Sequence, residues 1–490
     1  MSESSSRVSS STLDEGPQED VDIPPYSIIN PTERVFFVVL LSLVGLWSTM
    51  SSPIYFPALP VLSQYFKVSE PVMNLSVVAY LLSQGIAPTF SSNFADTIGR
   101  RPVILVSLVI FIAACIGLSQ TDVYWLLAVL RCVQAAGIAP VIAINSGIGG
   151  DITTRAERGG FVGIISGVQL MGNGFGGLIG SGLMASFDWR AIFIFLAIGG
   201  GCTLIVASVF LPETKRSIVG NCSIMPAKLI NRSPILNAPF IKKRLTNDYR
   251  TLDKAESLDL LAPFRILIKR SVVFTLFACG LQFAAWTMVL TSISTVLEKE
   301  YHYSILHVGL IYLPQGIACL VASIITGRFL NWYYCQKKSA YDKKYASIDP
   351  SERPPFNIYR TRLDVLLPGA IIMTSGLLIF GWCLEYKQHI ISIIISSCMI
   401  SFSASSFMAA GTTMLVDLYP GKGSTSTSCL NLVRCSLAAV GTGVLSNLTS
   451  AMGVGGCYTL MAGFCAIAYI LLVVVVLYSG TPTDTKIDKS

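Results

Sequence analysis

Residues 91–102 read Ser91-Ser-Asn-Phe-Ala-Asp-Thr-Ile-Gly-Arg-Arg-Pro102, a short charged turn between two long apolar runs. Neither the run from Val72 to Phe90 nor the run from Pro102 to Gln120 contains a charged residue. Each run is about as long as the 20 residues that a helix needs to cross a bilayer. The stretch therefore predicts a helical hairpin in a membrane, with one Asp and two Arg at the membrane edge.

The whole chain has the composition of a membrane protein with many spans. Of its 490 residues, 52% are hydrophobic and 13% are charged, whereas a soluble domain carries about 25% charged residues. Backbone polar groups must be satisfied internally in hydrocarbon, so each apolar run is predicted to be a helix. We count twelve such runs: Val35–Tyr55, Val72–Ser92, Val103–Ser119, Tyr124–Gly150, Gly160–Ser186, Ala191–Leu211, Ser271–Ile293, Val308–Tyr333, Val365–Leu384, Ile390–Val416, Ser424–Ser450 and Cys457–Tyr478.

The distribution of Lys and Arg predicts the orientation. With the N-terminus inside, the outer loops hold only Lys67, Arg190, Lys299 and Lys387, and nearly all the other basic residues fall in the tails and inner loops. This bias marks the cytoplasmic side, so both termini are expected to be cytoplasmic. The net charge of +7 then belongs to segments beside anionic lipid. On that ground we exclude binding of nucleic acid.

A basic cytoplasmic loop, residues 212–270, divides the spans six and six. The division predicts an all-α membrane protein with two six-helix bundles, residues 35–211 and 271–478, related by duplication. Gly327-Arg-Phe-Leu-Asn331 supports the duplication, because it echoes Ser92-Asn-Phe-Ala-Asp96 in kind. Residues 1–34 form a polar N-tail that is predicted to be disordered, and residues 479–490 form the C-tail.

The sequence contains no constellation typical of an enzyme. It has no P-loop, its three His lie near outer loops, and its 13 Cys include no C-x-x-C pair. We therefore expect no catalytic residue, no metal and no cofactor. A secondary transporter of a small-molecule substrate in the lipid bilayer remains by elimination. We expect it to work as a monomer.

Two spans contain an Arg away from their ends, and a third Arg, Arg328, lies near the end of the eighth span. Placing Arg131 or Arg434 near the middle of a span costs about 2.5–3.5 kcal/mol on insertion scales, so such a residue usually faces a wet cavity or a partner. Gln134 lies one turn after Arg131, and Asn431 lies one turn before Arg434. These four residues are candidates for proton coupling in a cavity, and partial snorkelling of Arg131 to the membrane surface is the alternative.

Aromatic and amide side chains in the spans are candidates for substrate contacts. Rings beside isolated amides suit flat or cationic ligands, and ordinary packing between helices is the alternative for each residue. The candidates are Tyr55, Tyr80, Gln282, Phe283, Trp286, Tyr312 and Gln315.

The fifth span is rich in glycine at the spacing that lets helices approach closely. Gly-x-x-x-Gly steps occur at Gly172, Gly176 and Gly180, and also at positions 159, 163 and 167. We expect either tight static packing or a pliable helix that slides during a conformational change, and the two are compatible. Gly172, Gly176 and Gly180 are therefore candidate residues of the conformational gate.

Taken together, the motifs resemble those of the major facilitator superfamily, in particular the twelve-span branch of the fungal drug:proton antiporters and its quinidine-resistance-type group. The loop motif of the superfamily is matched at Asp96, Gly99, Arg100 and Arg101, with Ser92 in place of a Gly. The motif of the fourth span is matched at Arg131, Gln134 and Gly137. In the fifth-span antiporter motif, Gly177 stands where Pro is usual. The group-level matches are Ile54-Tyr-Phe-Pro-Ala-Leu-Pro60, Leu211-Pro-Glu-Thr214, Tyr312-Leu-Pro314, Val416-Asp-Leu-Tyr-Pro420 and Asn431-Leu-Val-Arg-Cys435.

The resemblance implies proton-coupled export of drugs and amphipathic organic cations across the plasma membrane by alternating access. No Asp or Glu lies deep in any span, although proton-coupled carriers commonly use one. Coupling must therefore use an edge acid or the surroundings of Arg131. A carrier for one physiological solute (a polyamine, a choline-like amine or a cell-wall precursor) and a transport-dead receptor are the alternatives.

The turn at 91–102 is expected to act as a conformational gate. Asp96 would lie at the positive N-terminus of the span that begins at Ser424, an attraction of about 0.3–1 kcal/mol. Arg100 is expected to reach Glu157, or Asp417 at the end of the tenth span. Such contacts would close the cytoplasmic side and break when it opens.

Overall fold

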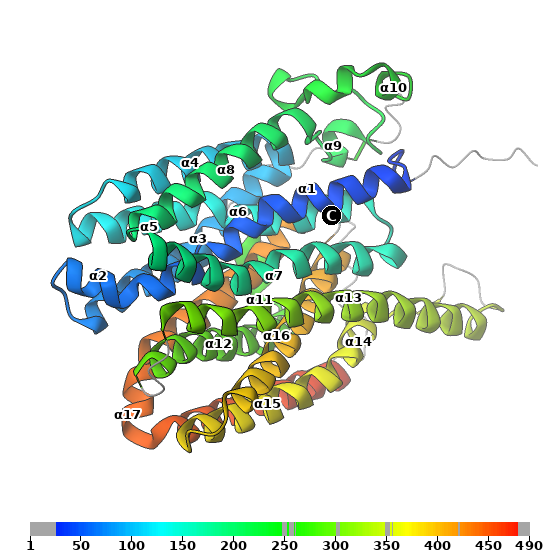
Figure 1. Cartoon of the computed structure of the whole chain (residues 1–490). Helices are drawn as coiled ribbons and strands as arrows, with labels where there is room; N and C mark the ends of the chain where they lie inside the picture. The colour runs from blue at the N-terminus through cyan, green and yellow to red at the C-terminus, as the bar shows by residue number, and fades with distance from the viewer. Residues whose placement is uncertain are drawn as a thin grey trace, which may run out of the picture.

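The computed structural model describes residues 26–478, apart from 247–251, 254–258, 260, 300–303, 348–352, 355 and 420–421. Most of the predicted disordered N-tail and the whole C-tail lie outside the described residues. Within the described part, all regular structure is helical (Figure 1).

The first half of the chain contains long helices joined by short turns. Their bounds are α1 Pro31–Met50, η1 Pro53–Ala58, α2 Leu59–Tyr65, α3 Glu70–Ile98, α4 Arg100–Ser119, α5 Tyr124–Ile138, α6 Pro140–Ile152, α7 Arg155–Ser186 and α8 Arg190–Phe210. Short elements follow in the central loop: α9 Arg216–Val219, η2 Leu229–Asn231, η3 Pro234–Asn237, α10 Pro239–Lys242 and α11 Ala262–Ile268.

The second half repeats the pattern of long helices. Its elements are α12 Arg270–Lys299, α13 Ile305–Lys344, α14 Ile358–Leu363, η5 Asp364–Leu366, α15 Leu367–Glu385, α16 Ile390–Leu418 and α17 Gly423–Tyr478. Residue Gly453 interrupts α17 with φ 75° and ψ 171°, so the predicted eleventh and twelfth spans form one helix with a sharp bend.

Local chemistry explains where several helices begin and end. Helix α1 begins with a capping box formed by Asn30 and Glu33, and Pro31 occupies the first helical position. Prolines 53 and 57 prevent a continuous helix beyond Met50, which leaves the 3₁₀ segment η1. Gly99, at φ 126°, separates α3 from α4, in a conformation that favours glycine.

The two halves meet along a few long helices. Within the first half, α4 packs on both α5 and α8, and α1 packs on α7. Within the second half, α12 and α15 both pack on α17, and α13 packs on α16. Across the halves, α7 lies along α13, and α3 and α6 lie against α17. In Figure 1, α1 begins at the end of the bundle that carries α9, α10 and α14. We call this the loop end.

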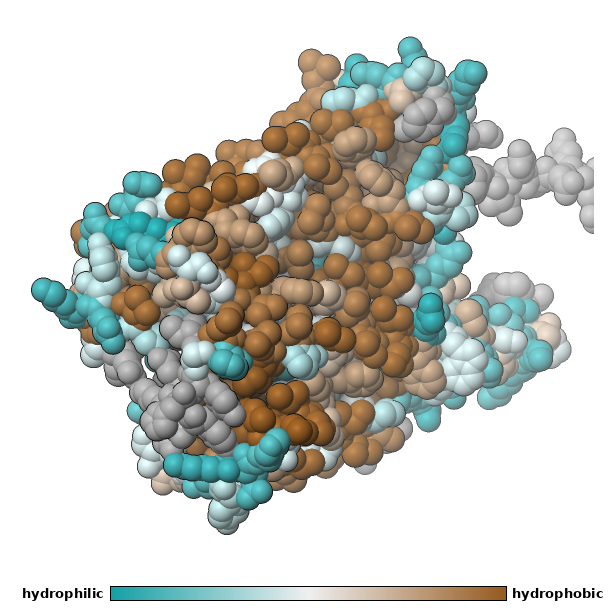
Figure 2. Space-filling view, in the orientation of Figure 1, coloured by the Kyte–Doolittle hydropathy of each residue, from teal (hydrophilic) through white to brown (hydrophobic). Residues whose placement is uncertain are grey.

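The surface agrees with a protein that lies in a membrane. Among the described residues, ten helices are long and apolar enough to cross a bilayer. Figure 2 shows a broad apolar band with polar residues gathered toward both ends. Helix α3 is not one of the ten, although it has 29 residues, and Gly423–Val475 counts once despite its bend.

For two of the predicted spans, the helices in the structure have other bounds than the predicted ones. The eighth was predicted to end at Tyr333, but α13 continues to Lys344, because a helix outside the membrane does not need apolar residues. Its extension includes an ion pair between Lys338 and Asp342 at 3.1 Å, one turn apart. The fourth span is divided at Ala139 into α5 and α6, with Pro140 at the first position of α6.

Candidate functional site

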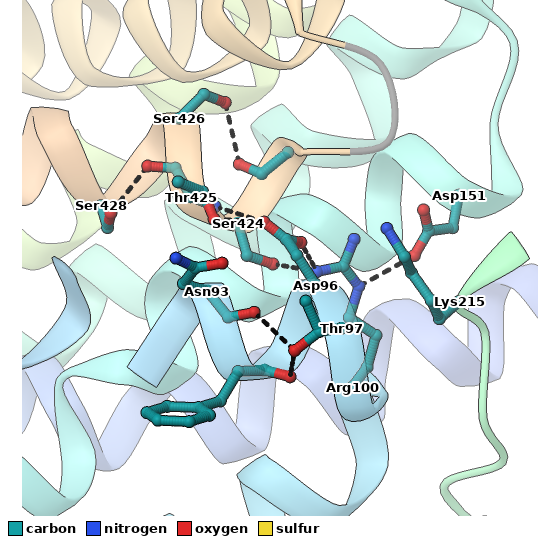
Figure 3. Close-up of polar contacts among 12 residues, drawn as sticks. Asn93, Asp96, Thr97, Arg100, Asp151, Lys215, Ser424, Thr425, Ser426 and Ser428 are labelled. Carbon is teal, nitrogen blue, oxygen red and sulfur yellow. Dashed lines mark hydrogen bonds and ion pairs between the residues drawn. The ribbon is translucent and has the colours of Figure 1, made fainter. Parts of the chain in front are cut away.

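The turn between α3 and α4 binds the start of α17 from the other half (Figure 3). The guanidinium of Arg100 is buried; its Nε donates to Asp151 at 3.0 Å and its Nη1 donates to Ser424 Oγ at 2.6 Å. The same Nη1 contacts one carboxylate oxygen of Asp96. The other oxygen accepts the backbone N–H of Thr425 at 2.9 Å. We call these five residues the Asp96 cluster.

The Asp96 cluster contains the contact expected between Asp96 and the start of the eleventh span. The carboxylate meets the first N–H groups of α17, where the helix dipole is positive. It also accepts the hydroxyl of Thr425. Residues more than 300 positions apart are thereby joined in a buried network. Removing one partner of a buried ion pair typically costs about 3–5 kcal/mol.

Glu213 holds the backbone of this turn in place. Its carboxylate accepts the N–H groups of Arg100 at 2.9 Å and Arg101 at 3.2 Å, and those of Thr214 and Lys215 at 3.0 Å each. Burial raises the pKa of Glu213, and the N–H groups of Lys215, Arg100 and Thr214 oppose that rise. A Cβ at residue 99 would collide with this carboxylate.

Arg101 binds the end of α8. Its Nη1 donates to the carbonyl oxygens of Ala207 at 3.2 Å and Leu211 at 2.6 Å, and its Nη2 donates to that of Ser208 at 2.7 Å. The last backbone hydrogen bond of α8 runs from the Leu211 N–H to the Ala207 carbonyl. The carbonyl of Ser208 lies beyond that bond, and a cation there also suits the helix dipole. Arg101 therefore links the turn between α3 and α4 to α8, within the first half of the chain.

A second buried cluster lies at the loop end. Asp417, at the end of α16, accepts Arg158 Nη1 of α7 at 2.6 Å and Arg362 Nε of α14 at 3.0 Å. We call these three residues the Asp417 cluster. Asn331, the counterpart of Asp96 in the echoed motif, donates to the carbonyl of Glu157 at the start of α7, at 3.3 Å.

The expected partners of Arg100 were wrong. Glu157 is exposed and pairs with Arg34 at 2.9 Å, while Asp417 is engaged by Arg158 and Arg362. Besides Asp96 on the preceding turn, the carboxylate that Arg100 reaches is that of Asp151. Helices α4 and α6 of the same half bring these two residues together, and sequence spacing alone does not decide between neighbouring acids.

Arg131 lies between two aromatic rings. Its Cζ is 4.2 Å from the ring centroid of Tyr55 and 4.1 Å from that of Tyr80. Its Nη1 donates to Gln134 Oε1 at 2.8 Å and to the carbonyl of Ser51 at 3.0 Å. Its exposed fraction is 0%, so it does not snorkel to the surface in this conformation.

A small central cavity lies between the halves. Its volume is about 30 Å³, room for one or two waters. Arg434 lines it, with Cζ 4.6 Å from the ring centroid of Phe283. The lining residues are Thr49, Ser52, Pro53, Phe56, Leu81, Gln84, Leu170, Asn173, Phe283, Thr287, Leu290 and Arg434.

The other predicted substrate residues lie outside this lining. Gln282 and Gln315 accept hydrogen bonds from Ser403 and Ser401 of α16, at 3.5 and 3.4 Å. Tyr312 donates to the carbonyl of Leu290 at 2.6 Å. Trp286 is buried, with its ring 5.8 Å from that of Phe283. Asn431 is also buried.

The sequence analysis missed two amides of the cavity. Gln84 on α3 and Asn173 on α7 both line it. Each is an amide side chain in a run without charged residues, which is the signal that would have found them.

Helix α7 uses its glycines on two faces. A Cβ at Gly172, Gly176 or Gly180 would meet α1 or η1, within the same half. A Cβ at residue 163 would meet Gly327, and one at residue 174 would come within 2.7 Å of Gly316, both on α13. The contact between the halves therefore uses the second set, and not the three glycines predicted for the gate.

Two groups of helices around a central cavity, joined at one end by buried charge clusters, define a membrane carrier. The profile of the Major Facilitator Superfamily matches residues 36–338. The human organic anion transporter MFSD10 (TETRAN) has the same fold, with a TM-score of 0.63 over 90% of this chain and 100% of that one, at 16% identity.

Fungal relatives are much more similar in sequence. The MFS antiporter QDR2 of Candida albicans is 56% identical over 98% of this chain and 96% of its own length. The multidrug transporter QDR2 of Candida glabrata is 42% identical over 91% and 80%, and quinidine resistance protein 1 of Saccharomyces cerevisiae is 38% identical over 93% and 85%. This chain belongs to the Major Facilitator Superfamily.

Proposed function

We propose that the chain is a drug antiporter that exports amphipathic drugs, organic cations among them, in exchange for protons by alternating access. The fungal relatives named above are antiporters and drug-resistance transporters, and their similarity extends over almost the whole chain. The observation that carries the mechanism is the Asp96 cluster, because a buried network between the two halves at one end is what a closed gate requires.

The proposal includes twelve membrane crossings, with both termini in the cytoplasm of the cell and the protein in the plasma membrane. Helix α3 and the two segments of α17 on either side of Gly453 would complete the set beyond the ten apolar helices. The loop end would then be cytoplasmic, because it carries the basic central loop. The functional unit is a monomer.

In this conformation both charge clusters are intact and the cavity is too small for a drug. Opening to the cytoplasm would separate Asp96 from Thr425 and Asp417 from Arg158, whereas the pair of Arg362 with Asp417 joins elements of the second half and would persist.

Arg131 and Gln134 would carry the coupling to protons. The guanidinium sits between two phenols and beside Gln134, without a carboxylate partner among the described residues. The two phenols belong to Tyr55 on η1 and Tyr80 on α3. When these elements move during transport, the electrostatic effect of the Arg131 guanidinium on the two phenols would change.

Flux measured in proteoliposomes tests the function. Saturable, pH-gradient-driven transport of quinidine and of unrelated drugs is expected. Transport of one amine or cell-wall precursor that drugs do not inhibit would favour a carrier for one solute. Binding without any flux, under several gradients, would favour a receptor.

A further inference from the structure

A second and larger cavity lies at the loop end, beside α1 and α8. Its volume is about 260 Å³, against about 30 Å³ for the central cavity. Its walls come from residues 28–37, from residues 210–213 at and after the end of α8, and from the central loop between Val219 and Leu245. In Figure 1, this loop with α9 and α10 lies beside the ends of α1 and α8. We call this space the loop-end cavity, and no step of the proposed antiport uses it.

The lining of the loop-end cavity is apolar apart from three charged residues, Glu33, Glu213 and Arg244. The carboxylate of Glu33 accepts the backbone N–H of Asn30 at 2.9 Å and Arg244 Nη1 at 2.8 Å. The carboxylate of Glu213 accepts four backbone N–H groups. Both acids of the lining are therefore already bound by donors, so neither is free to bind an organic cation. An apolar occupant suits such a lining, because it replaces water against apolar walls.

The loop-end cavity reaches the lipid-facing surface of the protein. Phe36 of α1 and Phe210 of α8 both line it, although they are 43% and 38% exposed. Their ring centroids are 5.8 Å apart. Val35 and Val39 on the same stretch of α1 are also exposed, and a continuous exposed apolar surface of this kind marks contact with a membrane. An acyl chain of the bilayer therefore reaches the cavity past the two rings.

Basic residues adjoin the mouth of the cavity. Arg244 pairs with Glu33, so the charges of these two lining residues balance. Lys242 and Lys243 directly precede Arg244 and are exposed, which leaves a positive surplus beside the mouth. Cations at a membrane surface attract anionic lipid head groups, and charge-assisted hydrogen bonds to phosphate are among the strong ones.

We infer that the loop-end cavity binds one acyl chain of an anionic phospholipid, whose phosphate lies beside Lys242 and Lys243. Such a lipid uses both features of the site, because its chain fills apolar space and its head group meets the cations. A soluble anion uses only the second, and a cationic drug is repelled by it. The site does not depend on the proposed antiport, and only its assignment to the cytoplasmic leaflet rests on the proposed orientation.

A bound acyl chain would also support the turn between α3 and α4. Glu213 belongs to the lining and accepts the N–H groups of Arg100 and Arg101. The central loop is held to the segment before α1 by a bond from the Ile28 N–H to the Asn221 carbonyl at 3.1 Å. The lipid adds packing contacts to both segments and beside Glu213. We therefore expect the N–H groups of Arg100 and Arg101 to exchange with solvent more slowly when the lipid is bound.

Photolabelling locates the acyl chain. A phosphatidylserine with a diazirine in one acyl chain is irradiated with the purified full-length protein, and the labelled peptides are identified by mass spectrometry. Labelling should be strongest at residues 28–37 and 219–245, and unlabelled phosphatidylserine should compete better than phosphatidylcholine with the same chains. Labelling spread evenly over the lipid-facing helices would overturn the inference. Competition by quinidine or by inorganic phosphate as effective as that by phosphatidylserine would also overturn it.

A cavity-filling variant tests the site of the acyl chain. Leu245→Trp puts a larger side chain into the lining and should reduce the labelling about ten-fold. Leu229→Trp is the matched control, because Leu229 belongs to the same loop, is 80% exposed and lies outside the lining. Equal labelling of the two variants would contradict the inference. If Leu245→Trp does not fold, the labelled peptides and the lipid competition in the unaltered protein still decide.

A charge variant tests the site of the head group. Lys242→Gln combined with Lys243→Gln should remove the preference for phosphatidylserine over phosphatidylcholine. Lys343→Gln combined with Lys344→Gln is the matched control, since these two lysines are exposed at the end of α13. A preference that survives the first pair of substitutions would refute the assignment of the phosphate to Lys242 and Lys243.

Amide exchange and drug flux are measured on the same preparation. Phosphatidylserine should slow the exchange of the Arg100 and Arg101 amides in the unaltered protein and not in Leu245→Trp; equal exchange with and without the lipid would refute the link to the turn. Intact pH-driven quinidine flux without localised labelling would refute the lipid inference alone. Localised labelling without any pH-driven drug flux would refute the proposed antiport alone.

Discussion

Arg131 is a buried guanidinium that has no carboxylate partner among the described residues. Two tyrosine rings cover its faces, and Gln134 and a backbone carbonyl accept from one of its nitrogens. The position of the arginine and its amide neighbour could be predicted from the sequence, because a charge in an apolar run is conspicuous. The pairing of Tyr55 with Tyr80 could not, since it depends on how η1 and α3 meet.

We expect Arg131→Ala to abolish pH-driven drug efflux, because two phenols and Gln134 would lose the charge that orients them. The rate should fall at least ten-fold in proteoliposomes at equal reconstitution. Arg131→Lys should restore only part of it, since an ammonium does not reproduce the planar contact with both rings. Unchanged efflux in Arg131→Ala would remove this residue from the coupling mechanism.

At the scale of the element, α7 shows where spacing patterns mislead. The glycine steps predicted close helix packing, and they provide it. The sequence could not say which face meets which neighbour. Gly172, Gly176 and Gly180, predicted for the gate, pack on α1 and η1 within the first half. The faces follow from the tertiary arrangement, which is not a property of one helix.

Gly174→Ala should destabilise the contact between α7 and α13. The added Cβ would come within 2.7 Å of both the Gly316 Cα and the Tyr312 carbonyl, and overpacking of this kind costs about 1–3 kcal/mol. A lower unfolding temperature and slower transport are expected. Gly182→Ala is the control, because a Cβ there meets nothing within 4 Å; equal effects of the two substitutions would count against the account.

Glu213 gives a graded test of the turn between α3 and α4. Glu213→Ala removes the acceptor of four N–H groups and should lower both the unfolding temperature and the transport rate. Glu213→Gln keeps one oxygen as an acceptor and should lie between the alanine variant and the unaltered protein. An alanine variant as stable and active as the unaltered protein would show that this carboxylate does not support the turn.

At the scale of the whole molecule, the sequence predicted the helical membrane fold and the contact of Asp96 with the start of the eleventh span. The echo of Asp96 at Asn331 is reflected in the structure, where both residues meet the first turn of a helix in the opposite half. The partner of Arg100 and the extent of α13 were missed, because both depend on packing outside the apolar runs.

The central claim is that the Asp96 cluster closes one side of the carrier and must open in each cycle. The most direct test is drug binding and drug turnover of Asp96→Asn in the same proteoliposomes, with Asp122→Asn, an exposed carboxylate at the other end, as the control. The amide can still accept from Thr425, so the protein should fold and bind drug within about two-fold of normal. It cannot neutralise Arg100, so turnover should fall at least ten-fold. Normal turnover, or loss of binding together with turnover, would contradict the account.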